Sequence, residues 1–272
     1  MQIRALTWNV FHGRDFPPDP ALRSRRSRLL RIPERGDTHV QVNADLSHHF
    51  HALVAEADWD VAMLQEFPPR WAEPLARRCG AESHLVLTSR NSLAPLRRLG
   101  ARLNPDLIGS NEGGSNLVLI RPTLGPITER RSLAVCPGPD PERRMLSFTR
   151  TTCGLCVANM HLSAGHARLQ LAEGELQRAA EQSVAWSGGA PLILGGDLNI
   201  RPRDSQVYDL LKDTFGLAGT TADDCLDHLL TRGLEIVEEP ARWPVVRREV
   251  VRPDGLRLRL SDHTPVAATY RS

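Results

Sequence analysis

Lysine is nearly absent from this 272-residue sequence, and aromatic residues are scarce. Lys212 is the one lysine among 34 basic residues, and Phe, Trp and Tyr together make up 5% of the chain. So strong a preference for arginine is typical of a coding bias of the source genome, and it assigns no anionic partner by itself. The scarcity of aromatic side chains counts against base stacking as a main source of nucleic-acid affinity.

Strong net charge and long apolar runs are also missing. The formal net charge is +2, so the overall field of the protein favours no class of partner. No apolar stretch approaches the roughly 20 residues of a membrane-spanning helix, and no basic-then-apolar secretory signal precedes the strand-like residues 3–10. We therefore predict a monomeric, cytoplasmic protein without a membrane segment.

Cysteine is too sparse, and odd in number, for a disulfide framework. The sequence has five cysteines, of which Cys153 and Cys156 form a C-x-x-C motif. There is no second such pair, and the surrounding residues read as a strand, on which positions three apart face opposite ways. We expect buried structural thiols rather than a zinc or redox site.

Strand-like and helix-like segments are mixed along the whole chain, with no linker, low-complexity tract or repeat between them. The composition, 41% hydrophobic and 24% charged, is that of a globular protein with a sizeable core. Residues 1–272 are therefore predicted to form a single domain. Within it, we expect one arginine-rich helix over residues 21–32 and a helix over residues 44–57 that is capped by Asn43.

The stretch PLILGGDLNI, residues 191–200, places polar side chains after a buried strand. Leu192, Ile193 and Leu194 form a short apolar run, and two glycines then allow close approach of the backbone to another group. If the strand continues, Asp197 and Asn199 point to the same face. A carboxylate and an amide in such a place are costly unless they bind a metal, a water molecule or a substrate. We predict that both belong to an active site.

Other strand-like runs end in polar residues of the same kinds. These residues are Asn9, Glu66, His161, Asp227 with His228, and Asp262 with His263. Active sites commonly assemble at strand ends from distant parts of a sequence. Carboxylate and amide oxygens suit a hard cation such as Mg²⁺, whereas a zinc site would require Cys or clustered His.

The residues in these segments, and their order along the chain, resemble the motifs of the endonuclease/exonuclease/phosphatase superfamily. That superfamily includes deoxyribonuclease I, exonuclease III-type nucleases, inositol polyphosphate 5-phosphatases and neutral sphingomyelinases. Six motifs carry the resemblance: TWN at 7–9, QE at 65–66, NMHL at 159–162, GDLN at 196–199, LDHLL at 226–230 and SDH at 261–263. Each motif is weak alone, but six in the right order over nearly the whole chain are specific for the superfamily. The resemblance implies a four-layer α/β/β/α sandwich in which two mixed β-sheets pack face to face.

The resemblance also implies roles for individual residues. Glu66 is similar to the main metal-binding carboxylate of the family, assisted by Asn9 and Asp262, with Mg²⁺ as cofactor and Mn²⁺ as a substitute. Asp197 matches the residue that orients or deprotonates the attacking water, and Asn199 the residue that holds the phosphate or that water. His263 matches the histidine that contacts the scissile phosphate, Asp227 the carboxylate that fixes its tautomer, and His161 the histidine that donates to a phosphate oxygen.

The substrate is left open by these motifs because they describe the hydrolytic machinery, while substrate choice depends on loops. Arginines at 23–31 and 90–102 favour a nuclease that acts on DNA, since phosphate contacts dominate nucleic-acid affinity. An inositol-type or small-molecule phosphatase, or a lipid phosphodiesterase, would use the same catalytic residues. A non-catalytic nucleic-acid-binding protein of this fold is a further alternative, although every motif position holds a competent residue.

We expect several other polar residues to lie outside the active site. We expect His48, His49 and His51 on the surface, and His228 on the face of its strand that points away from the site. For Asn159 the pattern does not decide between strand-end packing and a place beside His161. Arg121, Arg143 and Arg144 lie near enough to the motifs for contact with the substrate, but we expect them on the surface.

Overall fold

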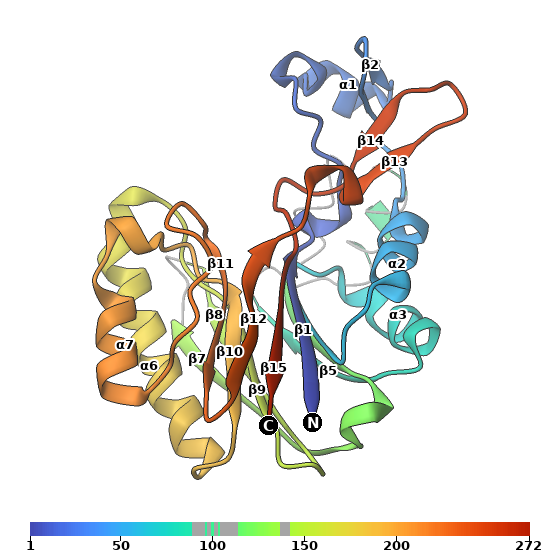
Figure 1. Cartoon of the computed structure of the whole chain (residues 1–272). Helices are drawn as coiled ribbons and strands as arrows, with labels where there is room; N and C mark the ends of the chain where they lie inside the picture. The colour runs from blue at the N-terminus through green and yellow to red at the C-terminus, as the bar shows by residue number, and fades with distance from the viewer. Residues whose placement is uncertain (89–95, 97–98, 101–102, 104–113, 137–141) are drawn as a thin grey trace.

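The computed structural model describes residues 1–88, 114–136 and 142–272, together with residues 96, 99, 100 and 103. Its main elements are two mixed β-sheets packed face to face with helices on the outside (Figure 1). The six-stranded sheet runs β12 (Glu235–Arg242), β15 (Val266–Arg271), β1 (Gln2–Asn9), β4 (Val61–Gln65), β6 (Ser115–Ile120) and β5 (Glu82–Leu87). The five-stranded sheet runs β11 (Asp227–Arg232), β10 (Leu192–Asp197), β9 (Cys156–His161), β8 (Arg144–Thr151) and β7 (Ile127–Cys136). The predicted four-layer sandwich is confirmed.

Three apolar clusters account for the layers. Between the two sheets, Met63 and Val118 from the first sheet pack with Ile193 of the second. Outside the first sheet lie α2 (Ser47–Glu56) and α3 (Ala72–Cys79), and outside the second lie α6 (Leu169–Ser187) and α7 (Val207–Phe215) (Figure 1). Alternation along each strand sends one set of side chains to the middle layer and the other to the helices. Among the described residues, no helix combines the length and the apolar character needed to cross a membrane.

Each sheet holds one pair of parallel strands, and these pairs bring distant polar residues to one edge. Strand β1 runs parallel to β4 and aligns Asn9 with Gln65, while β9 runs parallel to β10 and aligns His161 with Asp197. The antiparallel strand β11 then begins opposite Asp197, at Asp227. The middle layer is thus apolar over most of its length and polar at the end where these strands stop.

The arginine-rich segment contains two short helices instead of the single helix expected over residues 21–32. A 3₁₀ turn covers Pro20–Leu22, and α1 covers Arg25–Leu30. Ser24 separates them because its hydroxyl accepts the N–H of Ser27, which makes it the N-cap of a new helix. With β2 (Glu34–Arg35), β3 (Val40–Gln41), β13 (Glu249–Val251) and β14 (Arg257–Arg259), α1 forms an extension beyond the end of the sandwich where β1 stops (Figure 1).

Helix α2 begins later than its sequence pattern suggests. Asn43 does not cap it, because the Asn43 amide donates to the carbonyl of Arg28, and the Asp45 carboxylate accepts the N–H of Ser47 where the helix starts. On α2, His51 is buried rather than exposed and contacts the ring of Trp71 edge-on. Burial and the charge of Arg78 lower the pKa of His51 to about 4.

Two further features differ from what the sequence pattern indicates. The sequence pattern does not indicate strand β12, because it is an edge strand with a mostly exposed, glutamate-rich sequence and two register shifts, the second of which includes Pro240. Cys153 is exposed near the turn between β8 and β9, although its partner in the C-x-x-C motif, Cys156, is buried. Both cysteines are free thiols.

The two glycines of β10 allow neighbouring backbones to approach. A Cβ on Gly195 would lie 2.4 Å from the carbonyl oxygen of His228, and a Cβ on Gly196 would lie 1.9 Å from that of Met160. Gly196 also has a φ of +134°, a conformation that other residues rarely adopt. The close approach predicted from the sequence therefore serves the packing of β9, β10 and β11, which places Asp197.

We expect Gly196→Ala to destabilise the protein by about 3 kcal/mol or more, because it combines backbone strain with a clash against a fixed carbonyl. Urea unfolding measures the change. Gly174→Ala is the control: Gly174 lies within α6, where a Cβ would meet only the Arg178 side chain at 3.4 Å. That change should stabilise by about 0.5–1 kcal/mol. Equal changes in the free energy of unfolding for the two substitutions would contradict the role of Gly196 in the close packing of these strands.

Candidate active site

The polar ends of β1, β9, β10 and β11 meet at one point between the sheets. The amide nitrogen of Asn9 donates to Oδ2 of Asp197 at 2.9 Å, which joins the first sheet to the second. The same oxygen lies 3.5 Å from Nε2 of His161 and 3.6 Å from Nε2 of His263. Asp197 is buried and stands at the centre of this group.

His263 is held in place by its carboxylate partner and by the loop that carries it. Its Nδ1 lies 2.8 Å from Oδ2 of Asp227, at the start of β11. Ser261, in the left-handed region with φ +59°, donates to the carbonyl of Asn9 and accepts the N–H of His263. The indole N–H of Trp8 donates to the carbonyl of His263. The SDH motif is therefore anchored to the end of β1.

Burial lowers the pKa of His263, but the charges of Asp227, Asp197 and Asp262 outweigh it and raise the pKa well above the ordinary value. Burial has the opposite effect on Asp197, where it combines with Asp227 and Glu66 to raise the pKa to about 7 despite the charge of His263. The site therefore places a charged histidine beside a carboxylate whose pKa is about 7.

Glu66 lies on the opposite wall of the site. It follows β4 with φ +49°, and its carboxylate contacts His12 Nε2 at 3.1 Å and His161 Nδ1 at 3.9 Å. Burial raises the pKa of Glu66, but the charge of His12, the neighbouring His161 ring and hydrogen bonding from Asn9 outweigh it and lower the pKa to about 2. Glu66 is thus ionised throughout the neutral range.

His12 is a site residue that sequence reasoning missed. It lies in a short 3₁₀ turn after β1 and has φ +52°. Neither the strand pattern nor any motif extends to it. Its distance of three residues from Asn9, on the segment that leaves the site directly, is the only signal that the sequence offers.

Asn199 lies in the loop beyond the strand. Strand β10 ends at Asp197, so the condition that would place both side chains on one strand face is not met. With φ +52°, Asn199 donates its amide to the carbonyl of Leu162 and lines a neighbouring pocket together with Arg201. The backbone N–H of Asn199 donates to Oδ1 of Asp197, so the residue still supports that carboxylate.

Asn159 joins the two sheets beneath the site. Its side-chain oxygen accepts from Gln65 at 2.8 Å, and its amide donates to the carbonyls of Leu64 and Leu117. His228 faces the helix side of β11, where it packs against Tyr208, as expected. Asp262 is exposed beside His263, and partial desolvation, together with the negative charge of Glu66, raises the pKa of Asp262.

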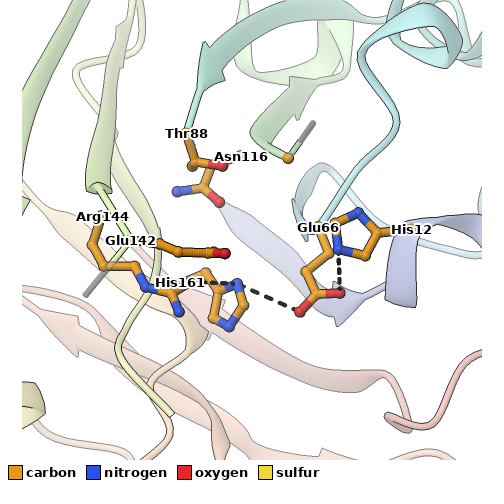
Figure 2. Close-up of a pocket in the computed structure, with 8 residues that line it drawn as sticks. His12, Glu66, Thr88, Asn116, Glu142, Arg144 and His161 are labelled. Atoms are coloured by element: carbon orange, nitrogen blue, oxygen red, sulfur yellow. Dashed lines mark hydrogen bonds and ion pairs between the residues drawn. The ribbon is translucent and has the colours of Figure 1, made fainter. Parts of the chain in front are cut away.

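A pocket of about 150 Å³ opens beside Glu66 (Figure 2). Its lining is polar and consists of His12, Glu66, Thr88, Gly114, Asn116, Glu142, Arg144 and His161. The side-chain oxygen of Asn116 is buried and has no hydrogen-bond partner among the residues that the structure describes, while its amide donates to the carbonyl of Met145. The arginines at 90, 97, 98 and 102 lie outside the described residues.

The donor set at this pocket fits a hard divalent cation. It offers the ionised carboxylate of Glu66 and the unsatisfied oxygen of Asn116, and oxygen atoms are the ligands that Mg²⁺ and Mn²⁺ prefer. Asp197, Asp227 and His263 also bring ligand atoms within 4.8 Å of one another. That trio contains the 2.8 Å contact between His263 and Asp227, so we interpret it as an oriented histidine.

The comparisons with known proteins agree with this geometry. Residues 6–263 match the Endonuclease/Exonuclease/phosphatase family, whereas no curated protein matches the sequence. Among solved structures, the mannosyl-6-phosphatase of Bacteroides thetaiotaomicron is 15% identical, with a TM-score of 0.64, and the match covers 99% of this chain and 100% of that one. TDP2 from Caenorhabditis elegans is also 15% identical, with a TM-score of 0.59 and coverage of 100% and 75%.

These low identities establish the fold and no substrate. The match to the family, in contrast, extends over nearly the whole sequence and includes every polar strand end described above, from Asn9 to His263. The chain therefore belongs to the Endonuclease/Exonuclease/phosphatase family, whose members are metal-dependent phosphoester hydrolases.

Proposed function

We propose that this protein hydrolyses phosphodiester bonds in DNA through attack by a water molecule that Asp197 orients and deprotonates. The observation that carries the proposal is the position of the Asp197 carboxylate, which lies within 3.6 Å of both His161 and His263. Its pKa of about 7 suits a general base at neutral pH.

The two histidines complete the chemistry. His263 is charged and oriented by Asp227, so it can donate to a non-bridging phosphoryl oxygen and stabilise the charge that develops there. His161 donates to a second oxygen from the other side of Asp197. Asn199 steadies Asp197 through its backbone N–H and holds the phosphate or the water from the adjoining loop.

Mg²⁺ is the proposed cofactor, with Mn²⁺ as a substitute, and Glu66 is its main ligand. A bound divalent ion would neutralise charge on the phosphoryl oxygens and on the leaving oxygen. Asp262 and the side-chain oxygen of Asn9 are the proposed additional ligands of the ion. In the structure that oxygen accepts the N–H of Phe11, and its second lone pair is the one that would bind the ion.

The nucleic-acid substrate is supported by the arginine-rich extension. Arg25, Arg26 and Arg31 are exposed on it, and the extension leaves the sandwich at the same end as the site (Figure 1). Such cations can contact the phosphates of a strand that lies across the site. A monomeric state and a cytoplasmic location belong to the same proposal.

A small-molecule phosphatase is the second candidate. It is favoured by the small, polar pocket beside Glu66, and the fold is shared with a protein named as a mannosyl-6-phosphatase. A panel of supercoiled plasmid, single-stranded DNA, RNA, bis-p-nitrophenyl phosphate and a phosphomonoester, assayed with Mg²⁺ and with EDTA, separates the two. Cleavage of the monoester alone would reject the nuclease, and no metal-dependent turnover on any substrate would reject the enzyme.

We expect Glu66→Gln to weaken Mn²⁺ binding by about 100-fold or more, beyond the 10–100-fold typical for residues that only support a ligand. The amide keeps the shape of the side chain but removes the charge that attracts the ion. Isothermal titration with Mn²⁺ measures the affinity. Glu73→Gln, an exposed change on α3, is the control. Unchanged affinity in the Glu66 variant would exclude Glu66 as the main ligand.

A further inference from the structure

Arg144 lies against the active-site histidine His161, although the sequence suggested a surface position. It is the first residue of β8 and is half-buried in the wall of the pocket beside Glu66 (Figure 2). Its Nη1 is 3.4 Å from Nδ1 of His161, and its buried Nε has no hydrogen-bond partner within the described part of the chain.

The contact determines which nitrogen of His161 carries the proton. A guanidinium has donors and no acceptor, so a neutral imidazole nitrogen that faces it must present a lone pair. Nδ1 is then the acceptor, and the proton lies on Nε2. Independently, Nε2 faces the Asp197 carboxylate at 3.5 Å, and a carboxylate accepts from an N–H. Both contacts select the same tautomer.

One neighbour favours the opposite arrangement. Oε1 of Glu66 lies 3.9 Å from Nδ1 and would accept a proton placed there. Arg144 is closer and supplies a competing donor, so it keeps Nδ1 unprotonated.

We propose that Arg144 is a positioning residue that holds His161 in the Nε2–H tautomer and directs that N–H to the space beside Asp197. The structural part of the proposal concerns the ring alone. Its consequence for catalysis rests on the proposed function, in which His161 donates to a phosphoryl oxygen. Without Arg144, the Glu66 carboxylate, 3.9 Å from Nδ1, can accept a proton from that nitrogen, and part of the population carries its proton on Nδ1.

Nitrogen-15 NMR of histidine-labelled, metal-free protein tests the structural part without any assay of activity. Multiple-bond ¹H–¹⁵N spectra distinguish the two neutral tautomers, and His161→Gln assigns the signals. We expect Nε2–H in the wild type and in Arg144→Lys, because lysine is also a donor only. In Arg144→Gln, Nδ1–H should appear, since an amide can also accept.

Arg143→Gln is the matched control, because Arg143 is exposed and donates to the carbonyls of Leu87 and Thr88 instead. It should leave the His161 signals unchanged. An Nδ1–H proton in the wild type would overturn the proposal, and this measurement needs no variant. A pure Nε2–H signal in Arg144→Gln would also overturn it.

Kinetics on bis-p-nitrophenyl phosphate test the consequence. Arg144→Gln should lower kcat by about 10–100-fold, as expected for residues that orient a functional ligand. Arg144→Lys should recover most of this loss, with KM little changed in both variants. If the wild type hydrolyses no phosphoester, the proposed function fails while the tautomer result still decides the role of Arg144. A normal kcat together with a shifted tautomer would remove Arg144 from catalysis.

Discussion

Asp197→Asn is expected to lower kcat by about 10²–10⁴-fold, the range that general base catalysis contributes. The carboxylate lies within hydrogen-bonding reach of Asn9 and close to both active-site histidines, so it is the central acceptor of the site. Asparagine has nearly the same shape and cannot take up a proton. Steady-state hydrolysis of bis-p-nitrophenyl phosphate with Mg²⁺ measures the loss.

This loss should occur without a loss of stability. The carboxyl of Asp197 ionises near its ordinary pKa in the unfolded chain but only near pH 7 in the folded protein. Its charge therefore costs stability increasingly as the pH rises from the ordinary value to about 7. A neutral amide avoids this cost, so the Tm of Asp197→Asn at pH 7.5 should equal or exceed that of the wild type.

Asp204→Asn is a suitable control, because it is the same substitution at an aspartate that is exposed in the 3₁₀ turn after β10. It should retain wild-type turnover. Equal activity of Asp197→Asn and the wild type would exclude Asp197 as the base. A fall in both activity and Tm would show instead that the carboxylate is needed mainly to hold the two sheets together.

His263→Ala is expected to lower kcat by about 10²–10³-fold, which is the typical cost of removing one donor to a charged transition state. Asp227→Asn should give a loss of the same kind. It leaves the ring in place but removes the carboxylate that holds Nδ1 at 2.8 Å. Single-turnover rates on bis-p-nitrophenyl phosphate measure both. Retention of full activity by His263→Ala would reject its contact with the phosphate.

The pH dependence of stability provides an independent readout for His263. Its pKa is raised in the folded protein, so its charged form contributes stability that is fully present below its ordinary pKa and is lost as the pH rises through the raised value. The Tm of the wild type should therefore decline more than that of His263→Ala on the alkaline side. Parallel curves would show that the ring is not charged in the native state.

Most of the sandwich could be predicted from local patterns. The apolar runs at β1, β4 and β10 are short and bounded by turn residues, and each ends in a polar residue within the next few positions. Strand β12 escaped because an exposed edge strand needs no apolar face. The helix expected over residues 21–32 is too long, because helical spacing does not reveal that Ser24 caps a new helix.

By itself, the sequence determined which polar residues end the strands and to which family of phosphoester hydrolases they point. Strand alternation and short motifs depend on a few neighbouring residues only, so both can be identified without the fold. Only the tertiary structure decided how these ends meet. The left-handed turns place His12 and Glu66 opposite each other, and Gly196 admits the backbone of β9. The contact of Arg144 with His161 is likewise visible only in space, because it depends on the pairing of strands rather than on periodicity.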